Sequence, residues 1–380
     1  MIKRSINFIR NRFKEKDKFI PLHVPCFIGN EKKYLKDCID STFVSSVGAY
    51  VDLFEEKMSL FTQTKKSVAV VNGTSALQIS LKLVGVKTND EVITQALTFV
   101  ATANAIKYNN AFPIFLDVDI DTMGLSPNAV EAFLDEYAEL RDDGCYNKST
   151  GRRISACMPM HTFGFPVNLD KLITICKKWS IPIVEDAAES IGSSYKGQST
   201  GSFGQVAGFS LNGNKIITSG GGGVITTNNI ELAKKAKFLT TTAKEPHPYE
   251  YHHSELGYNF RMPNLNAALA CAQLESIEVF LKNKRILANE YKAFFDSEGV
   301  KFRIENPETK ANYWLMCVEL ENIKERELFL KETNSSGVMT RPIWKSMDSL
   351  PMYKDCQKDS LKNTKFLEER IVNIPSSVIQ

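Results

Sequence analysis

The chain has 380 residues, of which 43% are hydrophobic and 24% are charged, and its formal net charge is +3. This composition is typical of a globular protein with a large core, and it excludes a largely disordered chain. The nearly balanced charge provides no overall field that would attract nucleic acid or a membrane surface. Because no apolar stretch approaches the ~18 residues that a spanning helix needs, we expect no membrane span.

Residues 1–18 form a locally basic segment, in which seven Lys or Arg side chains stand against two acidic ones. The apolar residues of this segment alternate with charges, which excludes the continuous apolar core of a signal peptide. The pattern predicts a short amphipathic helix that packs on the body of the protein. A weak contact with a membrane surface is the less favoured alternative.

The eight cysteines are scattered along the chain without CxxC spacing. This distribution favours free, mostly buried thiols in a reducing compartment. It gives no sign of a disulfide framework or a zinc site. We therefore expect a cytoplasmic protein that binds no metal.

From residue 67 onwards, β-rich runs alternate with helical stretches. Strands are predicted at residues 67–71, 90–94, 113–118, 154–160 and 181–186. Helices are predicted at residues 74–86, 99–108 and 168–179. This alternation predicts an α/β fold with a mostly parallel sheet that is covered on both faces.

After residue 262 the pattern changes. It predicts one long helix over 263–299, begun by Pro263 and ended by Gly299. The predicted elements that follow are an apolar-aromatic run, a helix and a last helical turn, at 313–318, 324–333 and 363–372. We expect a smaller α+β C-terminal domain that is joined through the long helix. The expected division is an N-terminal extension, a large domain, and a linking helix with the small domain: 1–18, 19–262 and 263–380.

Polar side chains follow the first predicted strand, in the stretch "VNGTSAL" at 71–77. Ligands of open α/β sheets bind at the carboxyl ends of the strands. Gly73 permits a tight turn there, and Thr74 and Ser75 open a helix whose free N–H groups and hydroxyls form an anion cradle. A plain helix cap without a ligand is the alternative for such a motif on its own.

Two carboxylates, Glu185 and Asp186, end the predicted strand "IPIVED". A carboxylate at the end of a buried apolar strand is uncommon unless it meets a cation. It could cap the next helix, or it could accept a hydrogen bond from a protonated heterocycle nitrogen such as a pyridinium.

Ser210 and Lys215 lie in the stretch "SLNGNKIITSGGGGVITT" at 210–227. Serine can hold a phosphate, and a lysine amine can form a Schiff base. A lone lysine beside glycines is usually solvated, but here it joins an anion cradle and a strand-end aspartate, each after a strand of one sheet. These three features are what pyridoxal 5′-phosphate (PLP) requires. His161 and Phe99 could add aromatic surfaces around a flat ring, or could belong to the core.

Five motifs carry a resemblance to a known family: "NGTSAL", "LTFVATANAI", "VEDAAESIGS", "FSLNGNKIITSGGGG" and "LGYNFRMPNLNAAL". They resemble the signatures of the DegT-type PLP-dependent nucleotide-sugar aminotransferases, which have the aspartate-aminotransferase fold, PLP fold type I. The resemblance extends from about 19–31 to 372–377, with the motifs in the family's order.

The resemblance implies a role for each matching residue. Lys215 forms the Schiff base with PLP and carries protons between the cofactor and the sugar carbon. Asp186 pairs with the pyridine nitrogen, and Glu189 faces the phenolic oxygen. The resemblance also implies that Phe99 stacks on the ring and that Asn259 reaches the phosphate from the second subunit of a homodimer. The residues that it implies for the phosphate cradle are Gly73, Thr74, Ser75 and Ser210.

Two flanking segments, 21–51 and 337–347, resemble the subgroup that aminates the 4-keto carbon of a UDP-linked 6-deoxy-N-acetylhexosamine, on the way to legionaminic acid or bacillosamine. The expected amino donor is L-glutamate. GDP-perosamine synthases share most of these motifs and are the first alternative. A related branch, with histidine in place of the lysine, performs dehydration, and some members suggest a silent PLP-binding regulator; the presence of Lys215 favours transamination over both. The residues that could face sugar or nucleotide are His161, Asn312, Tyr313, Arg341 and Trp344, although core or surface roles are open for each.

Overall fold

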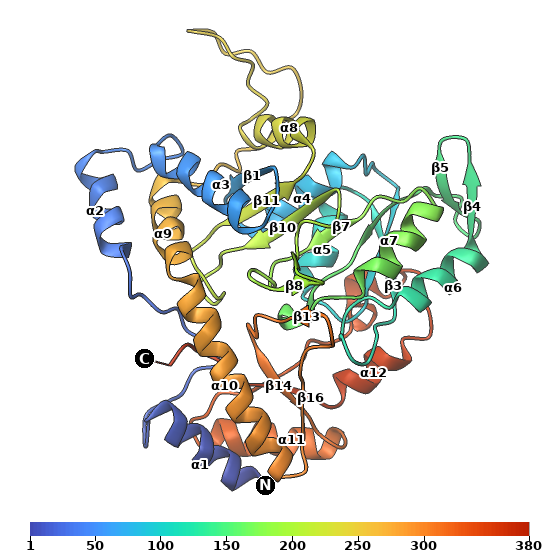
Figure 1. Cartoon of the computed structure of the whole chain (residues 1–380). Helices are drawn as coiled ribbons and strands as arrows, with labels where there is room; N and C mark the ends of the chain where they lie inside the picture. Colours follow the sequence, from blue (N-terminus) through green and yellow to red (C-terminus); the bar gives the residue numbers. More distant parts are fainter. Residues whose placement is uncertain (380) are drawn as a thin grey trace.

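The computed structural model of the chain describes residues 1–379 and contains one large mixed sheet (Figure 1). Its strands are β1 (Lys66–Val70), β2 (Glu91–Gln95), β3 (Phe112–Leu116), β6 (Ile154–Met158), β7 (Val184–Asp186), β10 (Val206–Ser210) and β11 (Gly223–Thr227). Ladders give the orders β1-β11-β10-β7 and β3-β2-β6, and parallel bridges between Cys157 and Ile183 and between Met160 and Asp186 join the two groups. Only β11 runs antiparallel to its neighbours, which confirms the mostly parallel α/β sheet.

Helices cover both faces of this sheet, as the buried strands require. They are α2 (Glu31–Asp40), α3 (Ala49–Phe61), α4 (Gly73–Leu83), α5 (Val100–Tyr108), α6 (Pro127–Tyr137), α7 (Leu169–Lys178) and α8 (Ile230–Thr240). Successive strand residues point to opposite faces: Ala69 packs in the cluster with α3, whereas Val68 and Val70 pack in the cluster with α4 and α8. In the same way, Val92 packs with α4 and α5, and Ile93 packs with α6 and α7. The predicted coverage on both faces is therefore confirmed.

The predicted helix over 263–299 is two helices in the structure, α9 (Asn264–Glu275) and α10 (Ile277–Ser297). At Ser276, which separates them, the backbone N–H bonds to the carbonyl of Gln273, three residues back rather than four. The Gln273 side chain is buried and bonds to the carbonyl of Cys26 and to Glu31. The prediction of one uninterrupted helix is wrong here, because anchoring from outside the helix is invisible in its own periodicity.

The C-terminal part contains a second, antiparallel sheet in the order β12-β14-β16-β15. Its strands and helices are β12 (Lys301–Phe302), β14 (Met316–Glu319), β15 (Arg341–Pro342), β16 (Ile371–Ile374), α11 (Ile323–Ser335) and α12 (Lys362–Glu368). The predicted helical turn at 363–372 is correct only as far as α12. Residues 371 and 372 belong instead to the buried strand β16, since their side chains enter the small core.

The N-terminal segment forms α1 (Ile2–Phe13), which confirms the predicted helix packed on the body. Phe8 stacks on Phe294 of α10 with ring centroids 4.3 Å apart, and Arg4 pairs with Glu298 at 2.6 Å. The chain then passes the C-terminal part, where Ile20 bridges to Val338 and the carbonyl of Leu22 accepts the N–H of Ser376 at 2.7 Å. Residues near the N-terminus, such as Ile20 and Leu22, therefore lie beside residues near the C-terminus. The division into three domains at residues 18 and 262 stays a prediction.

The remaining short elements lie at the margins of the two parts. They are β4 (Ala138–Arg141), β5 (Gly144–Asn147), β8 (Ser194–Tyr195), β9 (Gln198–Ser199), β13 (Thr309–Lys310) and the 3-10 turns Thr162–Gly164, Met347–Ser349 and Pro351–Tyr353. The free cysteines include Cys38, Cys145, Cys157, Cys176, Cys271, Cys317 and Cys356, and of these Cys356 alone is only half-buried. Within residues 1–379, no helix combines the length and apolar character that crossing a membrane requires.

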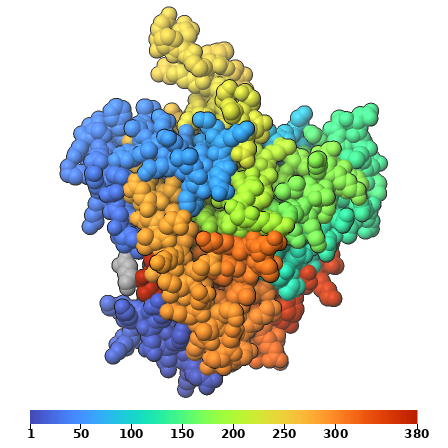
Figure 2. Space-filling view, viewed as in Figure 1, coloured from blue at the N-terminus to red at the C-terminus, as the bar shows by residue number. Residues whose placement is uncertain are grey.

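An arm formed by residues 243–257 projects from the body beyond α8 (Figures 1 and 2). Lys244 and His253 pair across its base. Tyr249, Tyr251 and Leu256 are 79%, 80% and 76% exposed. Large apolar side chains are thus held in solvent on a thin extension of the chain.

Candidate active site

A cavity of about 670 Å³ opens at the carboxyl ends of β7 and β10, where the large sheet meets the C-terminal part. Segments from along the chain form its wall. Its lining includes Leu22, Asn72, Gly73, Thr74, Phe99, Thr102, Asp186, Glu189, Ser210, Lys215, Trp314, Arg341 and Trp344. The position agrees with the expectation that ligands bind at strand ends of α/β sheets.

The first side of the cavity is the start of α4. The Asn72 side chain caps this helix by accepting the N–H of Ser75 at 2.8 Å. Gly73 lies so close to β10 that a Cβ at this position would be 2.7 Å from the Cβ of Ser210. Thr74 and Ser210 therefore line the cavity together beside the free N–H groups of the helix, whereas Ser75 is buried behind them.

Asp186 ends β7 and turns its carboxylate toward the cavity. One oxygen accepts the hydroxyl of Thr102 at 2.7 Å, and the other accepts the N–H of Ala188 at 3.1 Å. Only 2% of the residue is exposed. Burial raises the pKa of Asp186 above its ordinary value, although these two hydrogen bonds act in the opposite direction. A cation bound beside this buried carboxylate would therefore stabilise its ionised form.

Its neighbour Glu185 does not line the cavity and belongs instead to a buried polar network. Its carboxylate accepts the N–H groups of Gly201, Phe203 and Gly204 at 2.7–2.8 Å. Burial alone would raise the pKa of Glu185, but the bond from His161 and these backbone donors outweigh it and hold the pKa below its usual range.

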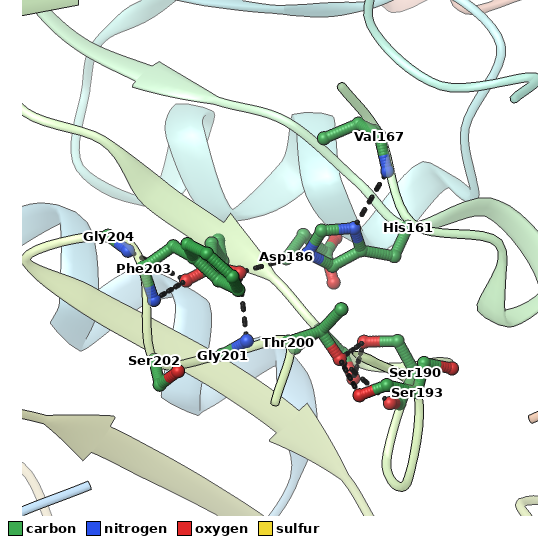
Figure 3. A network of polar contacts seen from close by, with 12 residues as sticks. His161, Val167, Asp186, Ser190, Ser193, Thr200, Gly201, Ser202, Phe203 and Gly204 are labelled. Carbon is green, nitrogen blue, oxygen red and sulfur yellow. Dashed lines mark hydrogen bonds and ion pairs between the residues drawn. The ribbon is translucent and has the colours of Figure 1, made fainter. Parts of the chain in front are cut away.

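His161 belongs to this network. Its Nε2 lies 3.0 Å from the Glu185 carboxylate, and its Nδ1 accepts the N–H of Val167 at 3.3 Å (Figure 3). The Nε2 therefore carries the proton and donates to Glu185. His161 is fully buried and does not line the cavity. The structure thus places this predicted substrate-facing residue outside the cavity wall.

Lys215 and Glu189 meet at the floor of the cavity. The Lys215 Nζ lies 3.4 Å from the Glu189 Oε1, and the other Glu189 oxygen accepts the N–H of Phe163 at 2.9 Å. Burial raises the pKa of Glu189 to about 7, although the charge of Lys215 acts to lower it. The lysine predicted to be catalytic is therefore a partly buried amine beside a carboxyl group that titrates near neutral pH, not a solvated surface side chain.

The glycines after Lys215 allow close packing of the backbone rather than forming the cavity wall. A Cβ on Gly223 would lie 2.3 Å from the carbonyl oxygen of Asn72, so β11 could not approach the α4 turn with a side chain there. Gly220 has a positive φ of 78°. Because these residues have no side chains, the start of α4 can pack closely against the segment that carries Lys215.

Thr102 and Trp314 are among the cavity residues to which the sequence analysis assigned no role. Thr102 lies one helical turn after Phe99 in α5, a spacing that could have indicated a shared face. Trp314 comes from the C-terminal part, and the Lys215 Nζ lies 3.7 Å from its ring centroid. No local pattern in the sequence could have paired Trp314 with the lysine, because the contact depends on how the two parts of the chain pack.

The other predicted contacts divide into three groups. Phe99, Arg341 and Trp344 line the cavity, and half of Phe99 is exposed. Asn312 and Tyr313 are buried next to it but do not line it. Asn259 is exposed and lies outside the cavity of its own chain.

The chemistry of this cavity fits PLP. An anion cradle at the start of α4 suits the phosphate, and Gly73 leaves the space that the cradle needs. A buried carboxylate at Asp186 would meet a protonated ring nitrogen, and Lys215 supplies a primary amine to the same cavity. A plain helix cap or a solvated lysine would not bring an anion cradle, a buried carboxylate and an amine to one cavity.

Comparisons with known proteins agree with this chemistry. The sequence profile of the DegT/DnrJ/EryC1/StrS aminotransferase family matches residues 25–378. EpsN of Bacillus subtilis (strain 168) is 35% identical over 88% of this chain and 84% of its own length. The GDP-perosamine synthase of Escherichia coli O157:H7 is 34% identical over 94% of this chain and 93% of its own.

A solved structure also shares the fold. The aminotransferase TlmJ from Streptoalloteichus hindustanus superposes with a TM-score of 0.85, at 23% identity, over 94% of this chain and 93% of its own. This likeness confirms the expected PLP fold type I. Taken with the match along nearly the whole sequence, it shows that the chain belongs to the DegT/DnrJ/EryC1/StrS aminotransferase family and is a PLP-dependent sugar aminotransferase.

Proposed function

We propose that the enzyme transfers the amino group of L-glutamate to C4 of a nucleotide-linked 4-keto-6-deoxy sugar. The preferred substrate is UDP-4-keto-6-deoxy-GlcNAc, for a surface glycan of the legionaminic acid or bacillosamine type. The observation that carries the reaction class is the gathering of the α4 cradle, Asp186 and Lys215 around one cavity. Buried free thiols such as those of Cys157 and Cys176 suit a cytoplasmic location.

A GDP-linked 4-keto-6-deoxy sugar is the second candidate substrate. It is favoured by the 34% identity to the GDP-perosamine synthase of Escherichia coli O157:H7, over nearly the full length of both chains. Both candidates need the same amino transfer at the same sugar carbon, so they differ in the groups that hold the nucleotide.

In this proposal each residue of the chain has a defined task. PLP, when bound, supplies an electron sink for the amino-acid carbon. Thr74 and Ser210 hold its phosphate, Ser75 supports them from behind at the start of α4, and Phe99 stacks on its ring. Asp186 keeps a proton on the ring nitrogen. The Lys215 amine takes the Cα proton from glutamate and later delivers a proton to sugar C4.

Glu189 faces the phenolic oxygen of the ring in this proposal. With a pKa of about 7 it can hold a proton at neutral pH and donate it in a hydrogen bond to that oxygen. Arg341 and Trp344 also line the cavity, and in this proposal they meet the sugar nucleotide or the glutamate carboxylates.

The active form is a homodimer in which each copy completes the site of the other. Two observations support this. Asn259 is exposed and lies outside its own cavity, and the nearby arm holds Tyr249 and Tyr251 in solvent. A second copy would cover these side chains and bring Asn259 to the phosphate of its partner's cofactor.

The substrate is tested with purified PLP-loaded enzyme, L-glutamate and a panel of 4-keto-6-deoxy sugars linked to UDP, GDP or dTDP. Mass spectrometry should find the amino sugar and 2-oxoglutarate in equal amounts, with the highest kcat/KM for the UDP-linked N-acetyl sugar. A clear preference for the GDP-linked sugar would select the second candidate. Loss of water from the sugar without 2-oxoglutarate would contradict aminotransfer.

The role of Lys215 is tested by reducing the PLP-loaded enzyme with borohydride and mapping the modified peptide. The pyridoxyl group should be on Lys215, and Lys215→Ala should lose both the label and the yellow colour. A label on another lysine would overturn the role.

A further inference from the structure

Trp314 makes two separate contacts with the segment that carries Lys215. The Lys215 Nζ lies 3.7 Å from the centroid of its ring, and its indole N–H donates to the carbonyl of Asn214 at 2.7 Å. The first contact holds the end of the lysine side chain, and the second holds the backbone immediately before it. Only 5% of Trp314 and 11% of the Lys215 side chain are exposed, so the contact between the amine and the ring is largely buried.

Trp314 is itself held in place by a buried clamp. The side chain of Asn312 accepts the N–H of Trp314 at 2.8 Å and donates to the carbonyls of Glu189 and Ile191 at 2.8 and 2.9 Å. The N–H of Asn312 donates to Ser193. Every hydrogen-bonding group of this amide is therefore used for structure, which explains why Asn312 is buried rather than substrate-facing.

These contacts close a ring of interactions around the lysine amine. It runs from Lys215 to Glu189, from the Glu189 carbonyl to Asn312, and from Asn312 through Trp314 back to Lys215. The amine thus has a carboxyl group on one side and an aromatic face on the other. An ammonium over an indole ring is attracted to its negative face, most strongly when water is excluded.

We propose that Trp314 is the positioning residue for Lys215: its face holds the amine while the lysine is not bonded to the cofactor, and its N–H fixes the backbone from which the lysine reaches. The proposal rests on the role proposed for Lys215. A free lysine side chain has four rotatable bonds, so an unheld amine spends much of its time away from the carbon whose proton it must take. Trp314 keeps it within reach.

Two substitutions separate the two contacts. Trp314→Leu removes both, and Trp314→Phe keeps an aromatic face but removes the indole N–H. In the PLP-loaded enzyme, the single-turnover reaction with glutamate should slow about 10-fold in Trp314→Leu and about 3-fold in Trp314→Phe. PLP affinity should stay close to that of the parent in both. Trp179→Phe, at the residue that caps the C-terminal end of α7, is the matched control and should react at the parental rate.

A second readout uses the full chain without PLP and does not depend on activity. An ammonium close to an indole changes its fluorescence, so Lys215→Met should change the tryptophan emission of the parent. The same substitution should leave the emission unchanged in the Trp314→Phe background, and should change it fully in the Trp179→Phe background. This pattern would identify Trp314 as the indole that the Lys215 amine contacts, and the single-turnover rates then test whether the contact positions the amine.

The outcomes are distinct. If Lys215→Met changes the emission equally with and without Trp314, or if Trp314→Leu reacts with glutamate at the parental rate, the proposal is wrong. If Trp314→Leu does not fold, Trp314→Phe carries both measurements, and a parental rate together with an unaltered fluorescence response overturns it. A borohydride label on another lysine would sink the role of Lys215, whereas the fluorescence pattern tests the Trp314 contact independently.

Discussion

Three carboxyl groups lie at the end of β7 or just after it, and each has a different environment. Glu185 is sealed behind the strand by backbone N–H groups and His161. Asp186 faces the cavity and accepts a hydrogen bond from the side chain of Thr102, and Glu189 lies beside Lys215. Alternation along a strand sends the first two to opposite sides. A carboxyl group thus stabilises the fold at position 185, whereas the carboxyl group at the next position can bind a ligand.

The Asp186 carboxylate should matter far more to the reaction than to the fold. We expect Asp186→Ala to retain PLP but to lower kcat by about 10²- to 10³-fold, because a preorganised charge at the ring nitrogen is lost. Thr102→Val removes one hydrogen bond to the same carboxylate and should cost about 10-fold or less. Steady-state kinetics with glutamate measures both. Full activity of Asp186→Ala would contradict its assigned role.

Glu189 should make the stability of the PLP-free protein depend on pH. Burial raises its pKa from 4.5 to about 7, so between these values the folded chain keeps a proton that the unfolded chain releases. The contribution of the protonated form is complete below about pH 4.5 and is lost as the pH rises to about 7, by about 3 kcal/mol.

Glu189→Gln cannot titrate, so its free energy of unfolding should lack this fall. Urea denaturation of both proteins from about pH 5 to about pH 8 measures the difference. Lys284 is buried, with a pKa lowered to about 7, but it is present in both proteins and cancels in the comparison. Parallel stability curves would show that Glu189 does not titrate in this range.

At the scale of single elements, α4 depends on a close approach to β10. Gly73→Ala places a Cβ 2.7 Å from the Cβ of Ser210, and the helix start must move to admit it. We expect a loss of stability of about 1–3 kcal/mol and weaker PLP binding, measured by denaturation and by titration with PLP. Ser80→Ala in the same helix is the control. The Ser80 hydroxyl is buried without a partner, so its removal should be neutral or stabilising, and equal effects of the two variants would refute the packing argument.

How far the sequence predicts an element depends on where its interactions lie. The buried strands β1, β2 and β7 show in short apolar runs, and α4 shows in its cap and glycine, because these signals are local. Gly73, Asp186 and Lys215 could be found since each follows a strand. The break at Ser276, the strand β16 and the contact of Trp314 with Lys215 could not, because each depends on residues distant in the chain.

At the scale of the whole molecule, the proposed homodimer can be tested by mixing two inactive variants. The proposal rests on the exposed arm at 243–257 and on Asn259. We expect Lys215→Ala and Asn259→Ala homodimers to be nearly inactive. Unfolding and refolding an equal mixture should restore about a quarter of the wild-type activity, because half of the molecules are mixed dimers with one intact site of two. Mixing without subunit exchange is the control. No recovery from a fully exchanged mixture would place Asn259 in the site of its own subunit.

The wall shared by Leu22 and the C-terminal strand has a consequence for the order in which the protein matures. Leu22 and Asn373 both line the cavity, and the N–H of Ser376 holds the carbonyl of Leu22. The large sheet is complete once residue 227 has left the ribosome, but this wall cannot close until residue 376 has followed. A nascent chain can therefore build the sheet long before it encloses a cofactor, and capture of PLP belongs to the last moments of synthesis or after it.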